Sequence, residues 1–500
     1  MRKGFLRGVL ILTAGSMLTR ILGFVYRIYV VRLLGAEGIG LYEMVFPVVT
    51  LILVITTAGI PVAVAKLVAD SNAQGRHREI AVIVHVSLAL LALTGIVVPS
   101  ALMYGASWFI PLAFSDPRVY WPFMALIPAV FLVSLSSVLR GYYQGINYMV
   151  PLAVGPLVEQ ITRFFAGITL VCWLLPYGLE FGAGALALAV VLGELAGLTV
   201  LVAFYWTNRP PALAREYGKP PGVTTVMKQL WHFSVPVTLA RILASLMLSA
   251  KAIMIPQRLQ LAGATVQQAT QLYGAFSGMA MSLINFPTVI TGSLSSVLLP
   301  TIASALTQKE YAALALRVNQ AFKITVLTAL PASVLFFFLA EPLTQVFFHS
   351  REAAVPLQWL APGCIFLYLQ QTTAGILYGM GKMGRLLGHS LFGNGVGLGL
   401  TYFLTAVPGF GIAGAALGLV VGAALTCFLN IIIIVRSMPI HFEWRGWLPQ
   451  ALAAAALMAG IVILLEPVLS LLVLVLAAGG FYLASLFALR ALGRQDFLFR

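Results

Sequence analysis

The sequence predicts an all-α polytopic membrane protein with fourteen transmembrane helices: two six-helix lobes that are parallel repeats, followed by two C-terminal helices. The chain has 500 residues, of which 60% are hydrophobic and only 9% are charged, whereas a soluble domain has about 25% charged residues. Apolar runs of about 20 residues, the length that crosses a ~30 Å hydrocarbon core, recur throughout. The predicted spans are residues 5–31, 41–68, 80–104, 120–140, 151–175, 183–207, 228–255, 272–302, 318–340, 357–380, 386–406, 411–435, 447–465 and 467–489.

An even number of spans places both termini on one side of the membrane. The Lys and Arg residues outside the spans gather mainly on that side, and the positive-inside rule therefore predicts that both termini are cytoplasmic. The basic start, Met1 to Arg7, is similar to that of a signal peptide, but the apolar stretch after it is too long and contains Arg20 and Arg27. We therefore expect an uncleaved first helix.

The charge distribution and the cysteines exclude several classes of function. The net charge of +15 is scattered over short loops, as topology signals are, and this argues against a nucleic-acid partner. Cys172, Cys364 and Cys427 are far apart and lie in apolar segments, without disulfide or metal-ligand spacing. We expect no metal site and no cofactor.

An internal repeat divides the chain. Four matches occur in order at an offset of about 220–240 residues, and six spans separate them, which makes the halves parallel repeats. Transporters built in this way bind substrate between the halves. We predict an N-lobe at 1–215, a C-lobe at 216–440 and C-terminal helices at 441–500. The matched pairs are Thr19–Leu22 with Ala240–Leu243, Phe46-Pro47 with Phe286-Pro287, Gly145–Met149 with Gly379–Met383, and Gly182–Ala185 with Ile412–Ala415.

Four arginines lie inside predicted spans: Arg20, Arg27, Arg163 and Arg241. A charge at the bilayer centre costs roughly 2.5–3.5 kcal/mol on insertion scales, so such residues usually face a bundle interior or a water-filled cavity. Arginine suits phosphate because its planar fork donates two parallel hydrogen bonds and keeps its charge when desolvated. We predict that these four arginines form an anion-binding cavity. For Arg27, which lies nearer the outer end, snorkelling to the interface is the alternative.

Four further polar residues are candidate cavity or counter-ion groups: Glu159, Glu194, Glu43 and Asn285. Glu159 precedes Arg163 by four residues, the favourable order for an ion pair on one helix, and a purely structural pair is the alternative. Glu194 and Glu43 could neutralise an arginine, bind a coupling cation or be protonated. Asn285 could instead hold helices together.

Two segments carry a resemblance to a known family. The first comprises Thr19–Phe24, Arg27, Arg32–Tyr42 and Phe46-Pro47, and the second comprises Arg140–Gly145, Met149, Pro151, Glu159, Gln160 and Arg163. They resemble the stage V sporulation protein B family, which belongs to the superfamily of multidrug, oligosaccharidyl-lipid and polysaccharide exporters and is similar to the lipid II flippases of cell-wall synthesis.

The resemblance implies two six-helix lobes in a V around a central cationic cavity, with the last two helices forming a groove for a polyprenyl tail. Arg20 matches a cavity arginine in the first helix of the lipid II flippases. Arg27 corresponds less closely, since it follows Arg20 by seven residues here and by six there. Arg241 corresponds only through the internal repeat.

We therefore expect a flippase for an undecaprenyl-pyrophosphate-linked saccharide in the bacterial cell membrane, with no catalytic residue. Its expected partners are the lipid-linked saccharide and the membrane, with cell-wall synthesis proteins as further candidates, and we expect a monomer. One alternative is a cation-coupled multidrug exporter of the same superfamily, although the excess intramembrane charge is basic. Another is a membrane enzyme acting on the same lipid, which usually needs paired carboxylates; the outer-loop acids are instead dispersed singly.

Overall fold

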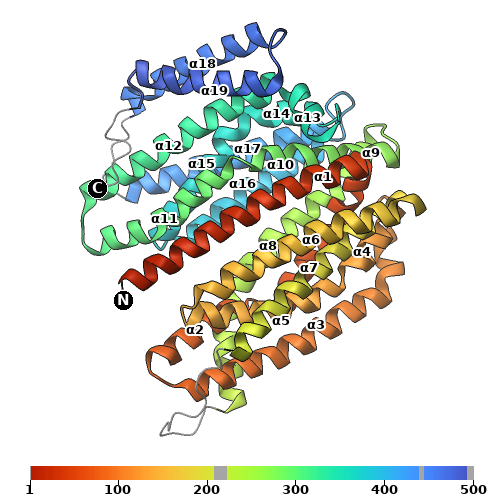
Figure 1. The fold of residues 1–500 in the computed structure, drawn as a ribbon, viewed down its shortest axis with the longest axis vertical. Coiled ribbons are helices and arrows are strands. Elements are labelled where there is room, and N and C mark those ends of the chain that lie inside the picture. The colour runs from red at the N-terminus through yellow and green to blue at the C-terminus, as the bar shows by residue number, and fades with distance from the viewer. Residues whose placement is uncertain (1, 208–221, 438–443, 493–500) are drawn as a thin grey trace. The chain divides into compact units, whose positions relative to one another are not determined.

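A computed structural model describes residues 2–207, 222–437 and 444–492. Within these ranges every regular element is a helix, and no strand is present (Figure 1). Ten helical stretches in these ranges are long and apolar enough to cross a membrane. The predicted all-helical membrane class is confirmed. Each of the fourteen predicted segments overlaps a helix, while the number of segments that cross the membrane stays a prediction.

The chain divides into two compact units, Met1–Gln257 and Arg258–Arg500. The predicted lobe boundaries, after residues 215 and 440, fall in 208–221 and 438–443, which lie outside the described residues. The three-part division into 1–215, 216–440 and 441–500 therefore stays a prediction. Each compact unit is described by itself below.

Unit 1 consists of long helices joined by short connections. Its largest pairing is that of α6 with α7, and α1 packs against both of them. The helices are α1 (Arg2–Thr57), α2 (Ile60–Ala73), α3 (His77–Ala113), α4 (Tyr120–Leu126), α5 (Pro128–Gly145), α6 (Met149–Leu174), α7 (Leu179–Thr207) and α8 (Val223–Leu261), which extends past the end of the unit.

Gly35 bends α1. Its φ of 67° and ψ of −178° are non-helical, and glycine adopts such angles without a Cβ penalty. The break falls between the predicted spans 5–31 and 41–68, so the two spans are one nominal helix with a sharp bend. Arg118 anchors the segment that follows the bend. Its guanidinium donates to Glu37 at 2.6 Å and to both carboxylate oxygens of the buried Asp116 at 2.8 and 3.1 Å.

The predicted continuous helix at 41–68 is wrong, because the chain leaves the helical conformation at Ala58 and Gly59. Their φ angles are 43° and 64°, and α2 then restarts with Pro61 in its first turn. Gly59 also approaches α8 closely: a Cβ there would lie 2.8 Å from the carbonyl oxygen of Ser234. Proline is tolerated at such a restart because the first N–H groups of a helix have no intrahelical partner.

Unit 2 has the same construction from helices, with more interruptions. A π-helical segment at Gly274–Ala280 joins α9 to α10. The helices are α9 (Val266–Tyr273), α10 (Met281–Asn285), α11 (Thr288–Thr307), α12 (Tyr311–Phe338), α13 (Ala340–Phe348), α14 (Ala354–Leu360), α15 (Cys364–Gly379), α16 (Met383–Leu404), α17 (Ile412–Ser437), α18 (Leu448–Leu465) and α19 (Leu471–Ala488).

Three further predicted spans are also interrupted, each beside a proline. The segment 272–302 is divided by the π-helical segment and again at Pro287. The segment 120–140 consists of two helices, α4 and α5, which meet just before Pro128, and α5 continues to Gly145. The segment 357–380 contains a short 3₁₀ turn with Pro362. Proline removes a backbone donor and clashes with the preceding turn, which weakens the helix at Pro128, Pro287 and Pro362; other prolines, such as Pro156 and Pro331, lie inside continuous helices.

Glycines set the closest helix pairing in unit 2, that of α16 with α17. A Cβ at Gly397 would lie 2.6 Å from the carbonyl oxygen of Gly418, and one at Gly422 would lie 2.8 Å from that of Gly393. Small residues with this spacing let membrane helices approach backbone to backbone. The α18–α19 hairpin packs on α12, where the buried Tyr482 hydroxyl donates to the carbonyl oxygen of Leu327 at 3.2 Å.

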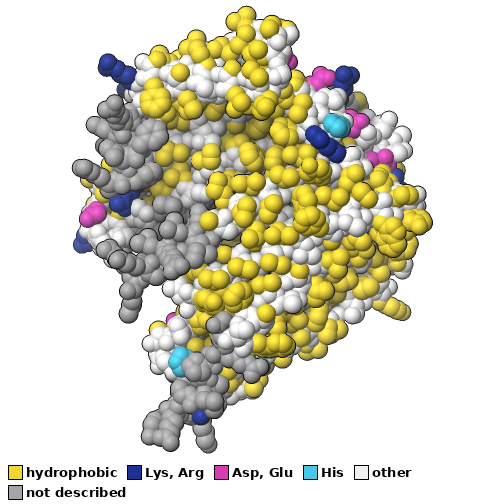
Figure 2. All heavy atoms as spheres, in the orientation of Figure 1, with side chains coloured by type: hydrophobic (Ala, Val, Ile, Leu, Met, Phe, Trp, Pro, Cys, Tyr) yellow, Lys and Arg dark blue, Asp and Glu magenta, His cyan; other side chains and the backbone are white. Residues whose placement is uncertain are grey.

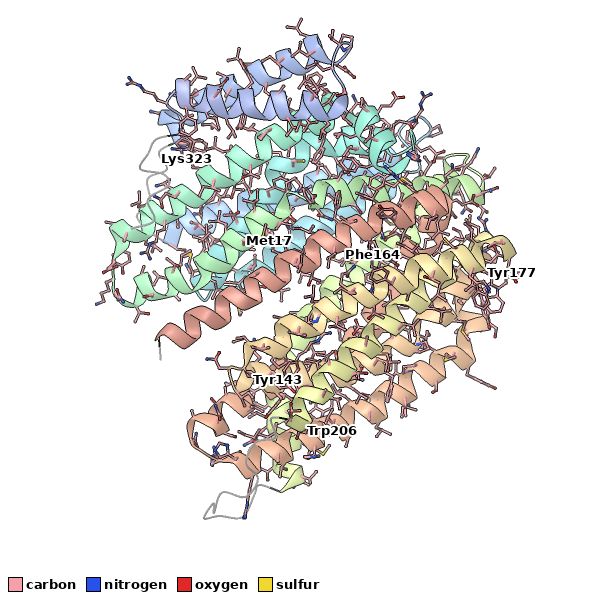
Figure 3. All side chains as sticks on the ribbon, in the orientation of Figure 1. Met17, Tyr143, Phe164, Tyr177, Trp206 and Lys323 are labelled. Carbon is pink, nitrogen blue, oxygen red and sulfur yellow. The ribbon has the colours of Figure 1, made fainter. Side chains whose placement is uncertain are left out.

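The surface is that of a protein surrounded by hydrocarbon. Figure 2 shows that hydrophobic side chains dominate the visible face, with few Lys, Arg, Asp or Glu side chains among them. Tyr177, before α7, and Trp206, near its other end, are both exposed and lie at opposite ends of that helix (Figure 3). Exposed aromatic residues at both ends of an apolar helix are typical of the two membrane–water interfaces.

Candidate functional site

The four predicted arginines fall into two kinds. Arg20 on α1 and Arg241 on α8 have exposed side chains, and within the described parts of the chain neither forms an ion pair or hydrogen bond. Arg27 and Arg163 are partly buried and each has a carboxylate partner. The structure thus separates two uncompensated cations from two that are neutralised locally.

Arg27 pairs with Glu43 across the bend in α1. The two residues are sixteen apart in sequence, and their side chains are 21% and 14% exposed. A straight helix would hold them more than 20 Å apart at about 1.5 Å per residue, so the bend at Gly35 makes the contact possible. The predicted role of Glu43 as a counter-ion corresponds to this ion pair.

A cluster of four charged side chains lies where α5, α6 and α7 meet, and we call it the charge cluster: Arg140, Glu159, Arg163 and Glu194. Arg163 Nη2 lies 2.7 Å from Glu159 Oε1, and Arg140 Nη2 lies 3.1 Å from Glu159 Oε2. Glu194 is less tightly held, since its oxygens lie 3.7 Å from Arg140 and from Arg163. The cluster contains equal numbers of acids and bases.

Two glycines on α7 make room for the charge cluster. A Cβ at Gly193 would lie 2.9 Å from the carbonyl oxygen of Glu159, and one at Gly197 would lie 3.4 Å from the Cβ of Glu159. The backbone of α7 therefore approaches α6 closely, and Glu194, next to Gly193, is carried to the Glu159 carboxyl. The neighbouring face of α6 packs on α1, where Phe164 contacts the rings of Tyr26 and Tyr29 with centroids 6.0 Å apart in each case (Figure 3).

Sequence reasoning assigned Arg140 to the cytoplasmic face and not to the site. The structure extends α5 five residues beyond Arg140, to Gly145, and Arg140 becomes the second base of the charge cluster. The longer helix is held by contacts with other helices: Gly141 packs on α2, where a Cβ would lie 2.6 Å from the carbonyl oxygen of Pro61, and Tyr143 donates to the carbonyl oxygen of Leu201 at 2.7 Å. Because these contacts are tertiary, the local sequence did not reveal them.

Asn285 lies in unit 2, at the end of α10, and its side chain is exposed. The charge cluster belongs to unit 1, so the role predicted for Asn285 in the cavity stays a prediction. A polar network that the sequence did not indicate lies elsewhere in unit 2, where Asn430 on α17 joins His389 on α16 at 3.0 Å and Thr373 on α15 at 3.2 Å. Asn430 is fully buried, so this network links three helices.

The site has charge but no metal-ligand set. Among the residues that the structure describes, no group of three or more His, Cys, Asp or Glu side chains is placed to hold a metal ion. What the arrangement offers is a set of guanidinium groups in apolar helices, some free to bind an anion and others held by carboxylates. Guanidinium groups of the first kind can bind phosphate oxygens by charge-assisted hydrogen bonds.

Fold and charge pattern together define a class: a polytopic membrane protein of the flippase and exporter type. A family model described as "Polysaccharide biosynthesis protein" matches residues 5–306, and the chain belongs to this family, within the multidrug, oligosaccharidyl-lipid and polysaccharide exporter superfamily. A second model, described as "MatE", matches residues 275–403.

Individual proteins agree with this assignment. "Stage V sporulation protein B" of Bacillus subtilis (strain 168) is 33% identical over 447 residues, which is 89% of this chain and 86% of the relative. "Lipid II flippase MurJ" of the same organism is 28% identical over 405 residues, covering 76% and 74% of the two chains. A solved structure, "Lipid II flippase MurJ, inward closed conformation", superimposes with a TM-score of 0.72 at 13% identity over 96% of this chain and 98% of the other, which shows a shared fold.

Proposed function

We propose that this chain is a flippase that moves an undecaprenyl-pyrophosphate-linked saccharide, of the lipid II type, across the bacterial cell membrane by alternating access. The sequence relative named as a lipid II flippase supports the substrate class. The observation that carries the proposal is the state of Arg20 and Arg241, two cations in apolar helices that have no acidic partner within the described residues.

Energetics favour an anionic ligand for these two arginines. Each guanidinium in a membrane span costs roughly 2.5–3.5 kcal/mol, and Arg27 and Arg163 offset that cost with carboxylates, whereas Arg20 and Arg241 do not. A pyrophosphate diester carries two negative charges and several acceptor oxygens, so it can engage two guanidinium groups at once. Each charge-assisted hydrogen bond contributes about 1.5–3 kcal/mol.

The remaining features of the proposal follow from the superfamily architecture. Two six-helix lobes within fourteen spans would rock about the bound pyrophosphate, with both termini in the cytoplasm, and α18 and α19 would hold the polyprenyl tail. The lipid chain would stay in the membrane while the saccharide crosses. The protein would make and break no covalent bond, act as a monomer and have cell-wall synthesis proteins as its candidate partners.

Reconstituted protein tests the proposal directly. Liposomes carrying the purified chain and a fluorescent undecaprenyl-pyrophosphate saccharide should translocate the lipid, and Arg20→Ala and Arg241→Ala should each slow translocation by about tenfold or more, since about 1.4 kcal/mol corresponds to a factor of ten. Arg20→Lys should recover only part of the rate, because it keeps the charge and loses the fork. Arg351→Ala, which removes a 78%-exposed arginine, is the control. Unchanged translocation in both alanine variants would falsify the arginine site.

A cation-coupled multidrug exporter is the second candidate, and the MatE match over residues 275–403 favours it. Such a protein needs carboxylates available to a cationic drug. Glu159 and Glu194 are the acids best placed for this in unit 1, but both contact Arg140 and Arg163. Efflux of a cationic dye from the same liposomes, abolished in Glu194→Gln and unaffected in Arg20→Ala, would favour this candidate over the flippase.

A further inference from the structure

The first part of α8 carries a cavity that the proposed arginine site does not use. It is an open hollow of about 600 Å³, a volume within the range of small-molecule sites. Its lining residues recur at intervals of three or four along the helix, so they share one face of α8. We call this cavity the α8 hollow, and it is lined by Met227, Lys228, Trp231, His232 and Val235.

The α8 hollow is a fixed feature of unit 1, because the opposite face of the same helix is buried. Val226 and Leu230 belong to the hydrophobic core that α8 shares with α2, α3 and α5, and Ser234 is also buried. Phe233 lies under the ammonium group of Lys66, which is 3.8 Å from the ring centroid. The hollow therefore lies on the outer side of a helix that its inner side holds in place.

The polar side chains of the α8 hollow suit an anion. Lys228 and His232 lie one helical turn apart and are exposed, the hollow is lined by no acid, and within the described residues neither side chain forms an ion pair. An ammonium group and an imidazole N–H at this spacing can donate to one phosphate group. Trp231, between them, is also exposed, and an exposed tryptophan is typical of the headgroup level of a membrane.

An apolar stripe continues from the hollow along the same face of α8, into the candidate membrane span Thr238–Leu261. His232 precedes that span by six residues, which is about 9 Å of helix. The headgroup layer adds on the order of 5–8 Å to each side of the hydrocarbon core, so the basic end lies near headgroup depth and the stripe lies among acyl chains. The exposed residues of the stripe are Val235, Leu239, Leu243 and Leu246.

We propose that this face of α8 binds an anionic phospholipid of the phosphatidylglycerol type, with its phosphate at Lys228 and His232 and an acyl chain along the apolar stripe. A whole lipid fits better than a soluble anion, because apolar surface directly adjoins the basic end. An anionic headgroup fits better than a zwitterionic one, because the hollow presents no acid to a headgroup ammonium. The predicted topology places this lipid in the cytoplasmic leaflet.

The lipid site is separate from Arg241, the arginine of α8 in the proposed flippase site. Arg241 follows Lys228 by thirteen residues, which places it about 140° around the helix and about 20 Å along it. The lipid at the hollow is therefore a resident lipid and not the transported one. The inference does not rest on the flippase proposal.

Native mass spectrometry of the purified full chain in detergent tests the site. The natural chain should bind one phosphatidylglycerol about fivefold or more tightly than phosphatidylcholine with the same acyl chains, since one basic group near an anionic lipid contributes about that factor. Lys228→Gln should remove most of this preference and leave phosphatidylcholine binding unchanged. The matched control is Lys309→Gln, which changes an exposed lysine after α11 and should keep the preference. Equal binding of the two lipids by the natural chain, or the same preference in both lysine variants, overturns the proposal.

Fluorescence quenching locates the bound lipid. Phosphatidylglycerol that is brominated near the glycerol end of its acyl chains quenches nearby indole rings. The chain has eight tryptophans, so the signal of Trp231 is the difference in quenching between the natural chain and Trp231→Phe. This difference should saturate at the affinity that mass spectrometry gives, and glycerol phosphate, which lacks acyl chains, should not displace the lipid.

Two outcomes of the quenching experiment overturn the proposal. Equal quenching in the natural chain and in Trp231→Phe would place the bound lipid away from the hollow. Displacement by glycerol phosphate would show a site for a soluble anion. Neither measurement involves translocation, so failure of the flippase proposal would leave both results valid.

Discussion

Arg20 and Arg163 lie in the same unit and in helices of similar apolar character, yet their surroundings are opposite. Arg163 has Glu159 at 2.7 Å and Glu194 at 3.7 Å, and its charge is offset within the fold. Arg20, like Arg241, is exposed and has no partner in the described parts of the chain. Charges that a fold neutralises contribute to its packing, whereas charges that it leaves open are available to a ligand. The two groups should therefore respond in opposite ways to substitution.

The largest effect on stability is expected from Glu159→Ala. This change removes the acid that accepts from both Arg140 and Arg163 and leaves the partly buried Arg163 and the more exposed Arg140 with Glu194 alone. Loss of one partner from a buried ion pair costs about 3–5 kcal/mol, so the thermal unfolding midpoint in detergent should fall by several degrees. Glu341→Ala, which breaks an exposed pair with Arg351, should cost only about 0–1 kcal/mol. Equal shifts in the two variants would contradict the distinction.

An intermediate loss of stability is expected from Gly193→Ala, which tests the packing that assembles the charge cluster. The added Cβ would meet the Glu159 carbonyl oxygen at 2.9 Å, and α6 and α7 would have to move apart, at a cost of about 1–3 kcal/mol. The control is Gly460→Ala on α18, where a Cβ meets nothing within 4 Å and alanine should stabilise the helix by up to about 1 kcal/mol. A neutral Gly193→Ala in the same unfolding assay would show that close α6–α7 contact is dispensable.

The smallest effect on stability is expected from Arg20→Ala and Arg241→Ala. Neither arginine contributes an ion pair within the described residues, so the unfolding free energy should change by no more than about 0.5 kcal/mol. The same variants are the ones expected to lose lipid translocation. A large drop in the unfolding midpoint of either variant would contradict this expectation and would show that the arginine stabilises the fold, as Arg163 does.

Composition and periodicity predicted the class of fold because the bilayer imposes it: a chain that is 60% hydrophobic with recurring long apolar runs must satisfy its backbone within helices. Helix continuity was harder to predict. The bend at Gly35 falls between two predicted spans, whereas the break at Ala58 and Gly59 depends on a neighbouring helix, since Gly59 is held against Ser234 of α8, 175 residues away in sequence. Apolar periodicity runs through such breaks unchanged, so the predicted helix 41–68 crossed one.

The candidate site likewise has one contact that the sequence predicted and others that only the tertiary structure brings together. The i, i+4 spacing of Glu159 and Arg163 predicted their ion pair, because one helix determines that distance. Arg140 and Glu194 lie on other helices, and only the glycines of α7 and the extra length of α5 bring them to the same point. No spacing rule covers contacts among three helices.

By itself the sequence determined that the chain is a helical membrane protein and that some of its predicted membrane spans contain arginines. Both conclusions follow from residue types and from the lengths of the apolar runs. Only the tertiary structure decided which of those arginines are neutralised. Arg27 meets Glu43 because Gly35 bends α1, and Arg163 meets Glu194 because α7 packs closely on α6. The physical reason is the short range of ion pairing: a carboxylate neutralises a guanidinium at about 3–4 Å, and the fold decides which side chains come that close.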